Sequence, residues 1–169
     1  MIKRNMIPLA AAFFLSGCAS LGLADLVQPP SFSAADGRAS ALRLLRPSAQ
    51  MPLGGASLRL WTRVRNPNSF GINLAGMDGE LYLENSRAAL VDLPLGLPLS
   101  AAQDTVIPID LSVNLADLPR LAGQLADALG GGSIAYRLDG TVAVETGAFG
   151  RQSFGPGTIV SGAVDVTRE

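Results

Sequence analysis

The sequence predicts a mainly β fold, an antiparallel sandwich of about seven strands with one short helix. Short runs with a two-residue hydrophobic period recur along the chain, separated by Gly, Pro, Asn and Asp. One stretch changes to helical spacing. The chain has 169 residues, 48% hydrophobic and 16% charged, which is the composition of a folded protein of one domain.

The most regular early strand covers residues 56–65. Its predicted inner side chains are Leu58, Leu60, Thr62 and Val64. Its predicted outer side chains are Arg59, Trp61, Arg63 and Arg65. We interpret this outer face as solvated, with a guanidinium packed on the indole, and a contact face for protein or lipid headgroups is the alternative.

Later strands follow the same rule. Residues 77–84 alternate and lead through Asn85-Ser86, a predicted hairpin turn, into residues 87–93. The cleanest alternation covers residues 106–114, and because Pro108 donates no ladder hydrogen bond, it predicts an edge strand or a nearby bulge. Residues 134–144 form a further strand, and residues 158–166 form a weaker last one. Regularly spaced strands with turn signals favour a fibronectin-III or immunoglobulin-like sandwich.

The single helix is predicted after Asp117, with Asp117 as its cap and Pro119 in its first turn. The leucines at helical spacing are Leu118, Leu121, Leu125 and Leu129. Residues 130–132 are all glycine and should end the helix, whereas a phosphate-binding loop would need a Gly-Lys-Ser that is absent. We interpret the leucines as core packing, and a helix lying in a membrane surface is the alternative.

Residues 1–17 have the organisation of a secretory signal peptide. A basic start precedes an apolar stretch at residues 6–15, which is too short to span a membrane. Residues 15–18 read Leu-Ser-Gly-Cys, which resembles the bacterial lipobox. This resemblance implies cleavage between Gly17 and Cys18 and a lipid on Cys18. An ordinary signal followed by a chance cysteine is the alternative.

The predicted anchor sets the expected location. Ala19 follows Cys18 where an Asp would retain a lipoprotein in the inner membrane, so we expect the outer membrane, facing the periplasm. Residues 18–37 are predicted to be a lipidated tether, and residues 38–169 the folded domain. We expect a membrane partner through the lipid anchor, and envelope proteins as further candidates.

Composition excludes several kinds of chemistry. The chain has one cysteine and no histidine, so it has no intrachain disulfide, histidine-dependent triad or imidazole metal ligand. Removal of residues 1–17 takes away Lys3 and Arg4 but no acidic residue, so the formal net charge falls from −1 to −3. Such a chain is not attracted to nucleic acid by bulk charge. We therefore expect no cofactor, no metal and no nucleic acid.

Three motifs in sequence order resemble a known family. They are the strand that ends in Asn66-Pro67-Asn68, the segment from Gly79 to Asn85 that contains Tyr82, and the Tyr136–Gly140 segment. Together they resemble the second group of late embryogenesis abundant proteins, which share the water-stress and hypersensitive-response domain. This resemblance implies a fibronectin-III-like sandwich and a link to desiccation or other water stress.

Each motif also has a simpler structural interpretation. Asn66-Pro67-Asn68 is typical of a turn at a strand end, with a ligand role as the alternative. The carboxylate pairs that are candidates for glycosidase chemistry are Glu80 with Glu84 and Asp110 with Asp139, and solvation explains them more simply. We therefore expect a non-catalytic envelope protein that protects membranes or proteins. The alternative is an adaptor lipoprotein that binds a partner through a sheet edge or through the Arg59, Trp61, Arg63 and Arg65 face.

Overall fold

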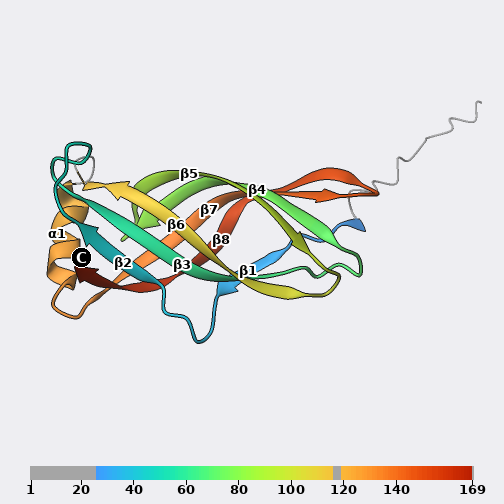
Figure 1. Ribbon diagram of the computed structural model, residues 1–169, viewed down its shortest axis with the longest axis horizontal. Helices are drawn as coiled ribbons and strands as arrows, with labels where there is room; N and C mark the ends of the chain where they lie inside the picture. The colour runs from blue at the N-terminus through green and yellow to red at the C-terminus, as the bar shows by residue number, and fades with distance from the viewer. Residues whose placement is uncertain (1–25, 116–118, 169) are drawn as a thin grey trace, which may run out of the picture.

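The structure, a computed structural model, describes residues 26–115 and 119–168. Long strands run lengthwise, and the single helix closes one end (Figure 1). In chain order the elements are β1 (Ser31–Ala34), β2 (Ala41–Leu45), β3 (Gly55–Arg65), β4 (Ile72–Leu83), β5 (Ser86–Leu99), β6 (Asp104–Asn114), α1 (Pro119–Ala128), β7 (Ser133–Thr146) and β8 (Gly150–Arg168). The mainly β fold with one short helix is confirmed.

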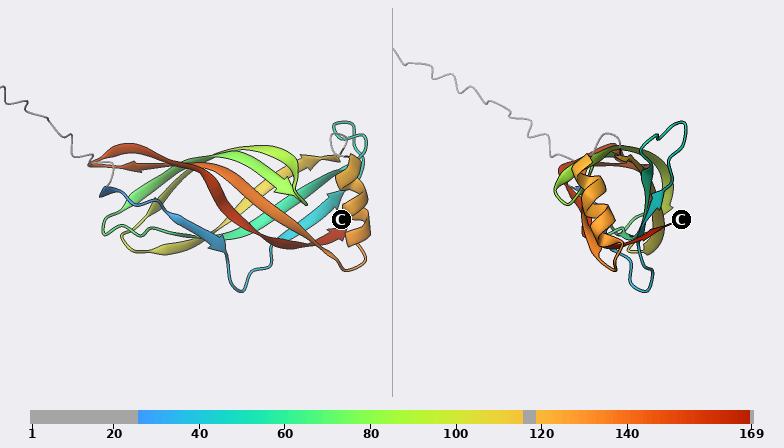
Figure 2. Two further views of the ribbon diagram at one scale, coloured as in Figure 1. Left: turned by 180° about the vertical axis from the view of Figure 1, so that it is seen from behind. Right: turned by 90° about the vertical axis from the view of Figure 1, so that its left-hand side faces the viewer.

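The strands form one curled sheet in the order β1-β3-β2-β8-β7-β4-β5, with β6 paired to β3. Because β6 follows β3 along its whole length, β2 and β1 share the other edge of β3, at residues 55–59 and 62–65. Every pairing is antiparallel except that of β2 with β8. The end-on view in Figure 2 shows the sheet wrapped around one interior, a sandwich-like arrangement.

The sheet differs from the prediction in two respects. It has eight strands, and the parallel β2–β8 pair makes it mixed. Two strands, β1 and β2, lie outside the predicted strand ranges, and β1 lies within residues 18–37, which were predicted to be tether. The four residues of β1 are too few to show a period, yet Phe32 packs against the core and Val27 is buried. The tether boundary at residue 37 was therefore wrong, and ordered structure begins before β1.

Two turns are also displaced from their predicted positions. The β4–β5 hairpin turns at Glu84-Asn85, whose φ angles of 47° and 63° give a type I′ turn, one residue before the predicted Asn85-Ser86. The last strand begins at Gly150 rather than near residue 158, because the glycine-rich segment pairs with β7. The edge position of residues 106–114 is confirmed, since β6 hydrogen-bonds with β3 alone among the described strands.

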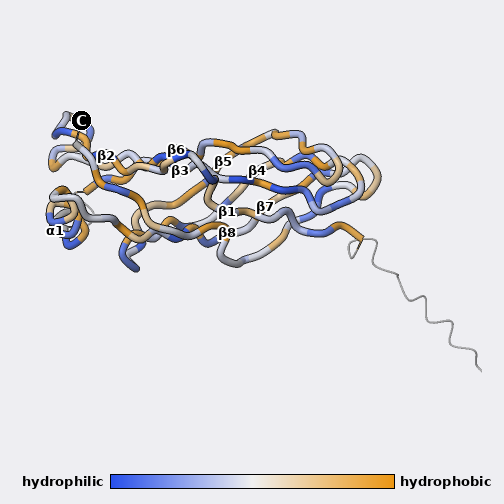
Figure 3. The backbone as a smooth tube through the Cα atoms, turned by 90° about the horizontal axis from the view of Figure 1, so that it is seen from below, coloured by the Kyte–Doolittle hydropathy of each residue, from blue (hydrophilic) through white to orange (hydrophobic). Residues whose placement is uncertain are grey.

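The interior is built from the predicted inward faces of the strands. Leu58, Leu60 and Val64 are fully buried in β3, and the hydropathy colouring of Figure 3 alternates along the strands. In α1, Leu121 and Leu125 are buried in the same core, so the helix covers one end of the sheet. The core interpretation of these leucines is confirmed, whereas Asp117 and Leu118 lie outside the described residues.

Candidate functional site

The outer face of β3 carries the four side chains that the alternation placed there. Arg59 and Arg65 are exposed, and Trp61 and Arg63 are half-buried, while the residues between them are buried. The neighbouring strands bring further groups to this face, since Asp110 of β6 lies opposite Arg59 and Ser33 of β1 lies opposite Arg63. This surface is the outer β3 face.

The indole of Trp61 is covered by a guanidinium from outside β3. The Cζ atom of Arg38 lies 4.4 Å from the centre of the Trp61 ring, in cation–π geometry. The predicted packing on the indole is thus present, but its partner is Arg38. The sequence could not identify it, because Arg38 belongs to a connection that follows β1, and the pairing of β1 with β3 brings it there.

Ion pairs hold most of the charge on the outer β3 face. Arg59 donates to both oxygens of Asp110, at 2.6 Å and 2.9 Å, and this hydrogen bonding lowers the pKa of the Asp110 carboxyl. Arg63 bridges Asp104 at 3.1 Å and Asp36 at 3.2 Å. These pairs are exposed, so they fix side-chain positions more than they stabilise the fold.

Beside Trp61 the outer β3 face is hollowed. This hollow has a volume of about 470 Å³. Its lining residues are Ala39, Ala41, Arg43, Ser57, Arg59, Trp61 and Asp110. Arg43 forms no ion pair with any residue that the structure describes. The hollow therefore places the Arg43 guanidinium beside the Trp61 indole, which Arg38 covers on one side, and this arrangement suits an acidic group.

Asn66 and Asn68 form a buried polar cluster at the end of β3. The Asn66 amide donates to the carbonyl of Phe70 at 2.8 Å and to that of Ser100 at 3.0 Å. Its oxygen accepts from the backbone and side-chain nitrogens of Asn68, at 3.0 Å and 2.9 Å. Asn68 in turn exchanges two hydrogen bonds with the backbone of Gln28, at 2.8 Å and 2.9 Å.

This cluster explains the Asn-Pro-Asn motif in structural terms. It joins the N-terminal segment, the β3–β4 loop and the β5–β6 loop at one end of the molecule. The amide of each Asn is used within the protein, which favours the turn interpretation over a ligand role. Sequence reasoning located the turn but not Gln28, because this contact spans 40 residues.

Tyr82 lies in a polar network on the outer surface of β4. Its hydroxyl donates to Glu80 at 2.6 Å, and Arg87 donates to the same carboxylate at 3.0 Å. These two hydrogen bonds lower the pKa of Glu80. Arg137 lies over the Tyr82 ring, 4.7 Å from its centre, and donates to Asp139 at 2.7 Å. The network joins β4, β5 and β7.

The carboxylates that were candidates for glycosidase chemistry are not brought together as acid and base. Asp110 is on β6 and Asp139 on β7, two strands that are not neighbours in the sheet. Glu84 accepts from the backbone of Ala135, away from Glu80. Hydrogen bonds from Thr158 and Arg137 lower the pKa of Asp139, whereas a general acid needs a raised one.

Tyr136 and Gly140 belong to the interior and to a strand crossing. Tyr136 is 4% exposed, and burial raises the pKa of its hydroxyl. Gly140 lies opposite Gly79 in the β4–β7 register, and a Cβ at Gly140 would overlap the carbonyl oxygen of Asp78. The sequence does not show that Gly140 pairs with a second glycine, because strand register is not visible in it.

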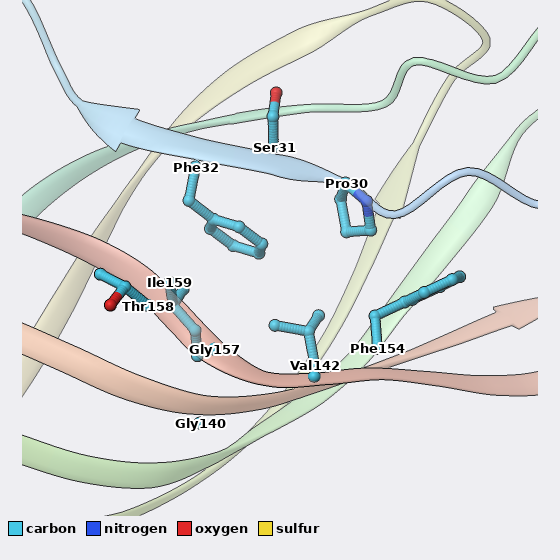
Figure 4. Close-up of a pocket in the computed structure, with 10 residues that line it drawn as sticks. Pro30, Ser31, Phe32, Gly140, Val142, Phe154, Gly157, Thr158 and Ile159 are labelled. Carbon is cyan, nitrogen blue, oxygen red and sulfur yellow. The ribbon is translucent and has the colours of Figure 1, made fainter.

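An apolar cavity of about 260 Å³ lies between β1 and the β7–β8 hairpin. Figure 4 shows Phe32 of β1 and Pro30 facing Val142 and Ile159 across it. Two of its lining residues carry hydroxyls: that of Thr158 already donates to Asp139 at 2.7 Å, and that of Ser31 points away from the other lining side chains in Figure 4. We interpret the cavity as a gap in packing, because it has no converging set of polar groups.

The remaining predicted site residues, Gly17 and Cys18, lie outside the described residues. Within residues 26–115 and 119–168, no three acidic or cysteine side chains are grouped so that they could hold a metal ion. In the same part of the chain, no helix has both the length and the apolar character to cross a membrane.

Comparison with solved structures finds likenesses at low sequence identity. The solution structure of an Arabidopsis thaliana protein has a TM-score of 0.51 and 16% identity, covering 83% of this chain and 80% of that one. A crystal structure of a protein from Archaeoglobus fulgidus has a TM-score of 0.45 and 12% identity, covering 77% of this chain and 97% of that one. The first likeness supports the fold alone. A search of curated proteins found no match.

The family comparison is more specific. A family model described as late embryogenesis abundant protein (LEA_2) matches residues 62–156, which is more than half of the chain. The match includes the Asn-Pro-Asn turn, Tyr82, Tyr136 and Gly140. The chain therefore belongs to the LEA_2 family of late embryogenesis abundant proteins.

Proposed function

We propose that this chain is a non-catalytic, lipid-anchored envelope protein that protects membranes or proteins during water stress. Family membership carries the proposal, because it suggests a water-stress-related protein of a generally non-enzymatic family. The non-catalytic part has further support, since hydrogen bonds lower the pKa values of Glu80, Asp110 and Asp139, whereas a general acid needs a raised one. The Leu-Ser-Gly-Cys sequence at residues 15–18 supports the lipid anchor.

The lipid anchor is tested by Cys18→Ser in the full-length chain. We expect the native chain to incorporate labelled fatty acid and to fractionate with membranes. The variant should carry no label and should keep the mobility of the unprocessed precursor, because only a thiol forms the thioether. A variant that was processed and membrane-bound like the native chain would contradict the anchor.

The protective role is tested by survival. A strain that lacks the gene should survive drying or osmotic shock less well than its parent, and the native gene should restore survival. Complementation with the Cys18→Ser variant separates the two parts of the proposal. Restoration by this variant would mean that the domain protects without an anchor, and equal survival of deletion and parent strains would refute protection.

An adaptor role is the second candidate, and the hollow beside Trp61 favours it. The mature chain contains no lysine, so amine-reactive crosslinkers are unsuitable. A photoreactive amino acid at Ser57 would lie in the hollow, and one at exposed Ser153 of β8 is the matched control. One stoichiometric product from Ser57, lost in Trp61→Ala, would support an adaptor, whereas diffuse products from both positions would favour a protectant.

A further inference from the structure

One end of the molecule has no charged residues in its connecting segments. Four segments meet there, at residues 26–30, 66–71, 100–103 and 147–149, and none contains Asp, Glu, Lys or Arg. Figure 1 shows them at the end opposite α1, where the described chain begins. We call this surface the uncharged end.

Hydrogen bonds and a ring contact hold the uncharged end together. The Asn66–Asn68 cluster binds the backbone of Gln28 and Ser100, so it joins three of the four segments. Phe149 of the fourth segment lies against Phe70, with 5.6 Å between ring centres. The loops thus form one defined surface.

The uncharged end presents apolar side chains to its surroundings. Leu26 is 58% exposed, which makes it one of three large hydrophobic residues with such exposure in the described chain. The rings of Phe70 and Phe149 are partly exposed, and Ala148 at the tip of the β7–β8 turn is exposed. Phe and Leu are among the side chains that interfacial segments bury at the boundary between headgroups and acyl chains.

The opposite end differs in charge. Its loops and helix carry Arg46, Glu84, Arg120 and Asp127, of which all but Glu84 are exposed. Leu53 of the β2–β3 loop is also exposed at this opposite end, but its surroundings there are charged, so apolar insertion meets fewer charges at the uncharged end. The charged residues within two positions of these segments in the sequence are Asp25, Arg65, Asp104, Glu145 and Arg151. Three are acidic and two are basic, so attraction to anionic lipid would contribute little there.

The position of the predicted anchor restricts the orientation further. Cys18 precedes Leu26 by seven intervening residues, which span less than about 30 Å even when fully extended. β8 alone has 19 residues, a length of about 60 Å. A lipid on Cys18 would therefore hold the bilayer close to the uncharged end and out of reach of α1 in an upright molecule.

We propose that the uncharged end rests on the bilayer that holds the lipid anchor, with Leu26, Phe70 and Phe149 at headgroup depth. The inference rests on the proposed anchor and adds an orientation to it. The long axis of the sheet is then directed away from the membrane surface, with α1 at the far end. The outer β3 face, with its hollow beside Trp61, stays in water and accessible to other molecules.

Tryptophan fluorescence on vesicles tests this orientation with the full lipidated chain. In a Trp61→Phe background, Ala148→Trp reports on the uncharged end, and Leu53→Trp, on the 68%-exposed Leu53 of the β2–β3 loop, is the matched control. On phosphatidylcholine vesicles with brominated acyl chains, the Ala148→Trp emission should shift to the blue and fall by about twofold or more. The Leu53→Trp emission should stay unchanged.

The fluorescence of native Trp61 tests the alternative orientation, in which the molecule lies on its side on the membrane. Trp61 is the only tryptophan of the chain, so quenching of the native chain would mean that the molecule lies on its side with the outer β3 face on the membrane. Phe149→Trp is a second reporter for the uncharged end if Ala148→Trp does not fold. Three results would overturn the proposed orientation. They are quenching of Trp61, equal quenching of Ala148→Trp and Leu53→Trp, and no quenching of either Ala148→Trp or Phe149→Trp.

The same preparation separates failure of the orientation from failure of the anchor. Mass measurement and vesicle flotation report whether the chain carries lipid and binds bilayers. A lipidated, bound chain without quenching at the uncharged end overturns the orientation alone. A chain that carries no lipid overturns both proposals.

Discussion

Asn66 illustrates how one residue can define a family motif without taking part in chemistry. Its side chain is fully buried, and its amide group is satisfied by the backbone of two loops and by Asn68. A buried amide is tolerated where its hydrogen-bonding groups find partners. The motif is therefore explained by the geometry of the loops it holds.

The first prediction concerns this cluster. Asn66→Ala should lower the free energy of unfolding by about 2–4 kcal/mol, because it removes the buried partner of the Asn68 backbone N–H and the donor to the part-buried carbonyls of Phe70 and Ser100. Urea unfolding monitored by circular dichroism would measure the loss. The control is Ser69→Ala in the same loop, where the side chain is exposed and the change should be small. Equal stability of both variants would contradict a structural role.

Tyr136 gives a prediction of pH dependence. Burial raises the pKa of its hydroxyl in the folded state, so its contribution to stability is intact below the unfolded value near 10 and is lost as pH rises above it. Tyr136→Phe should therefore lose less stability than the native protein between neutral pH and pH values above 10. Thermal unfolding at a series of pH values would measure this, and parallel curves for both proteins would refute it.

At the scale of elements, the crossing of β4 and β7 depends on two glycines. Gly79 and Gly140 face each other in the register, and an added Cβ on either would overlap backbone of the other strand. Glycine is used in strands where another backbone approaches closely. The Tyr136–Gly140 motif thus combines a core side chain with a point of close strand contact.

Gly140→Ala tests this crossing. We expect a loss of about 2–4 kcal/mol in the free energy of unfolding, since the methyl group meets backbone that cannot move aside without breaking the ladder. Gly147→Ala is the matched control, because nothing lies within 4 Å of a Cβ there. Urea unfolding of the two variants should separate them clearly. Equal stabilities would show that the strands adjust without cost.

The elements differ in how well the sequence predicts them. β3 and β6 were predicted almost to their ends, because long alternation with one buried face fixes both the strand and its orientation. β1 and β2 were missed, since strands of four and five residues are too short to establish a period. The β4–β5 turn was displaced by one residue, because Glu84 has a positive φ that its residue type does not favour.

At the scale of the whole molecule, the N-terminal segment is part of the fold. Val27 is buried, Phe32 packs on the core, and the backbone of Gln28 pairs with Asn68. The segment also supplies β1, which pairs with residues 62–65 of β3. The folded unit is thus larger than residues 38–169.

Two truncations test this boundary. A chain that begins at residue 38 should be less stable than one that begins at residue 26 by about 3–5 kcal/mol, because it loses the apolar burial of Val27 and Phe32 and the two part-buried hydrogen bonds between Gln28 and Asn68. Urea unfolding of both chains measures the difference. Equal stability would place residues 26–37 outside the cooperative unit.

The sequence by itself determined the class of fold, the inward and outward faces of the long strands, the edge position of β6 and the family signature. These follow from local periodicity and turn chemistry, which act over a few residues. The partners of the signature residues were decided by tertiary structure alone. Arg38 on Trp61, Gln28 on Asn68 and Gly79 opposite Gly140 all depend on strand order and register, because they join positions far apart in the chain.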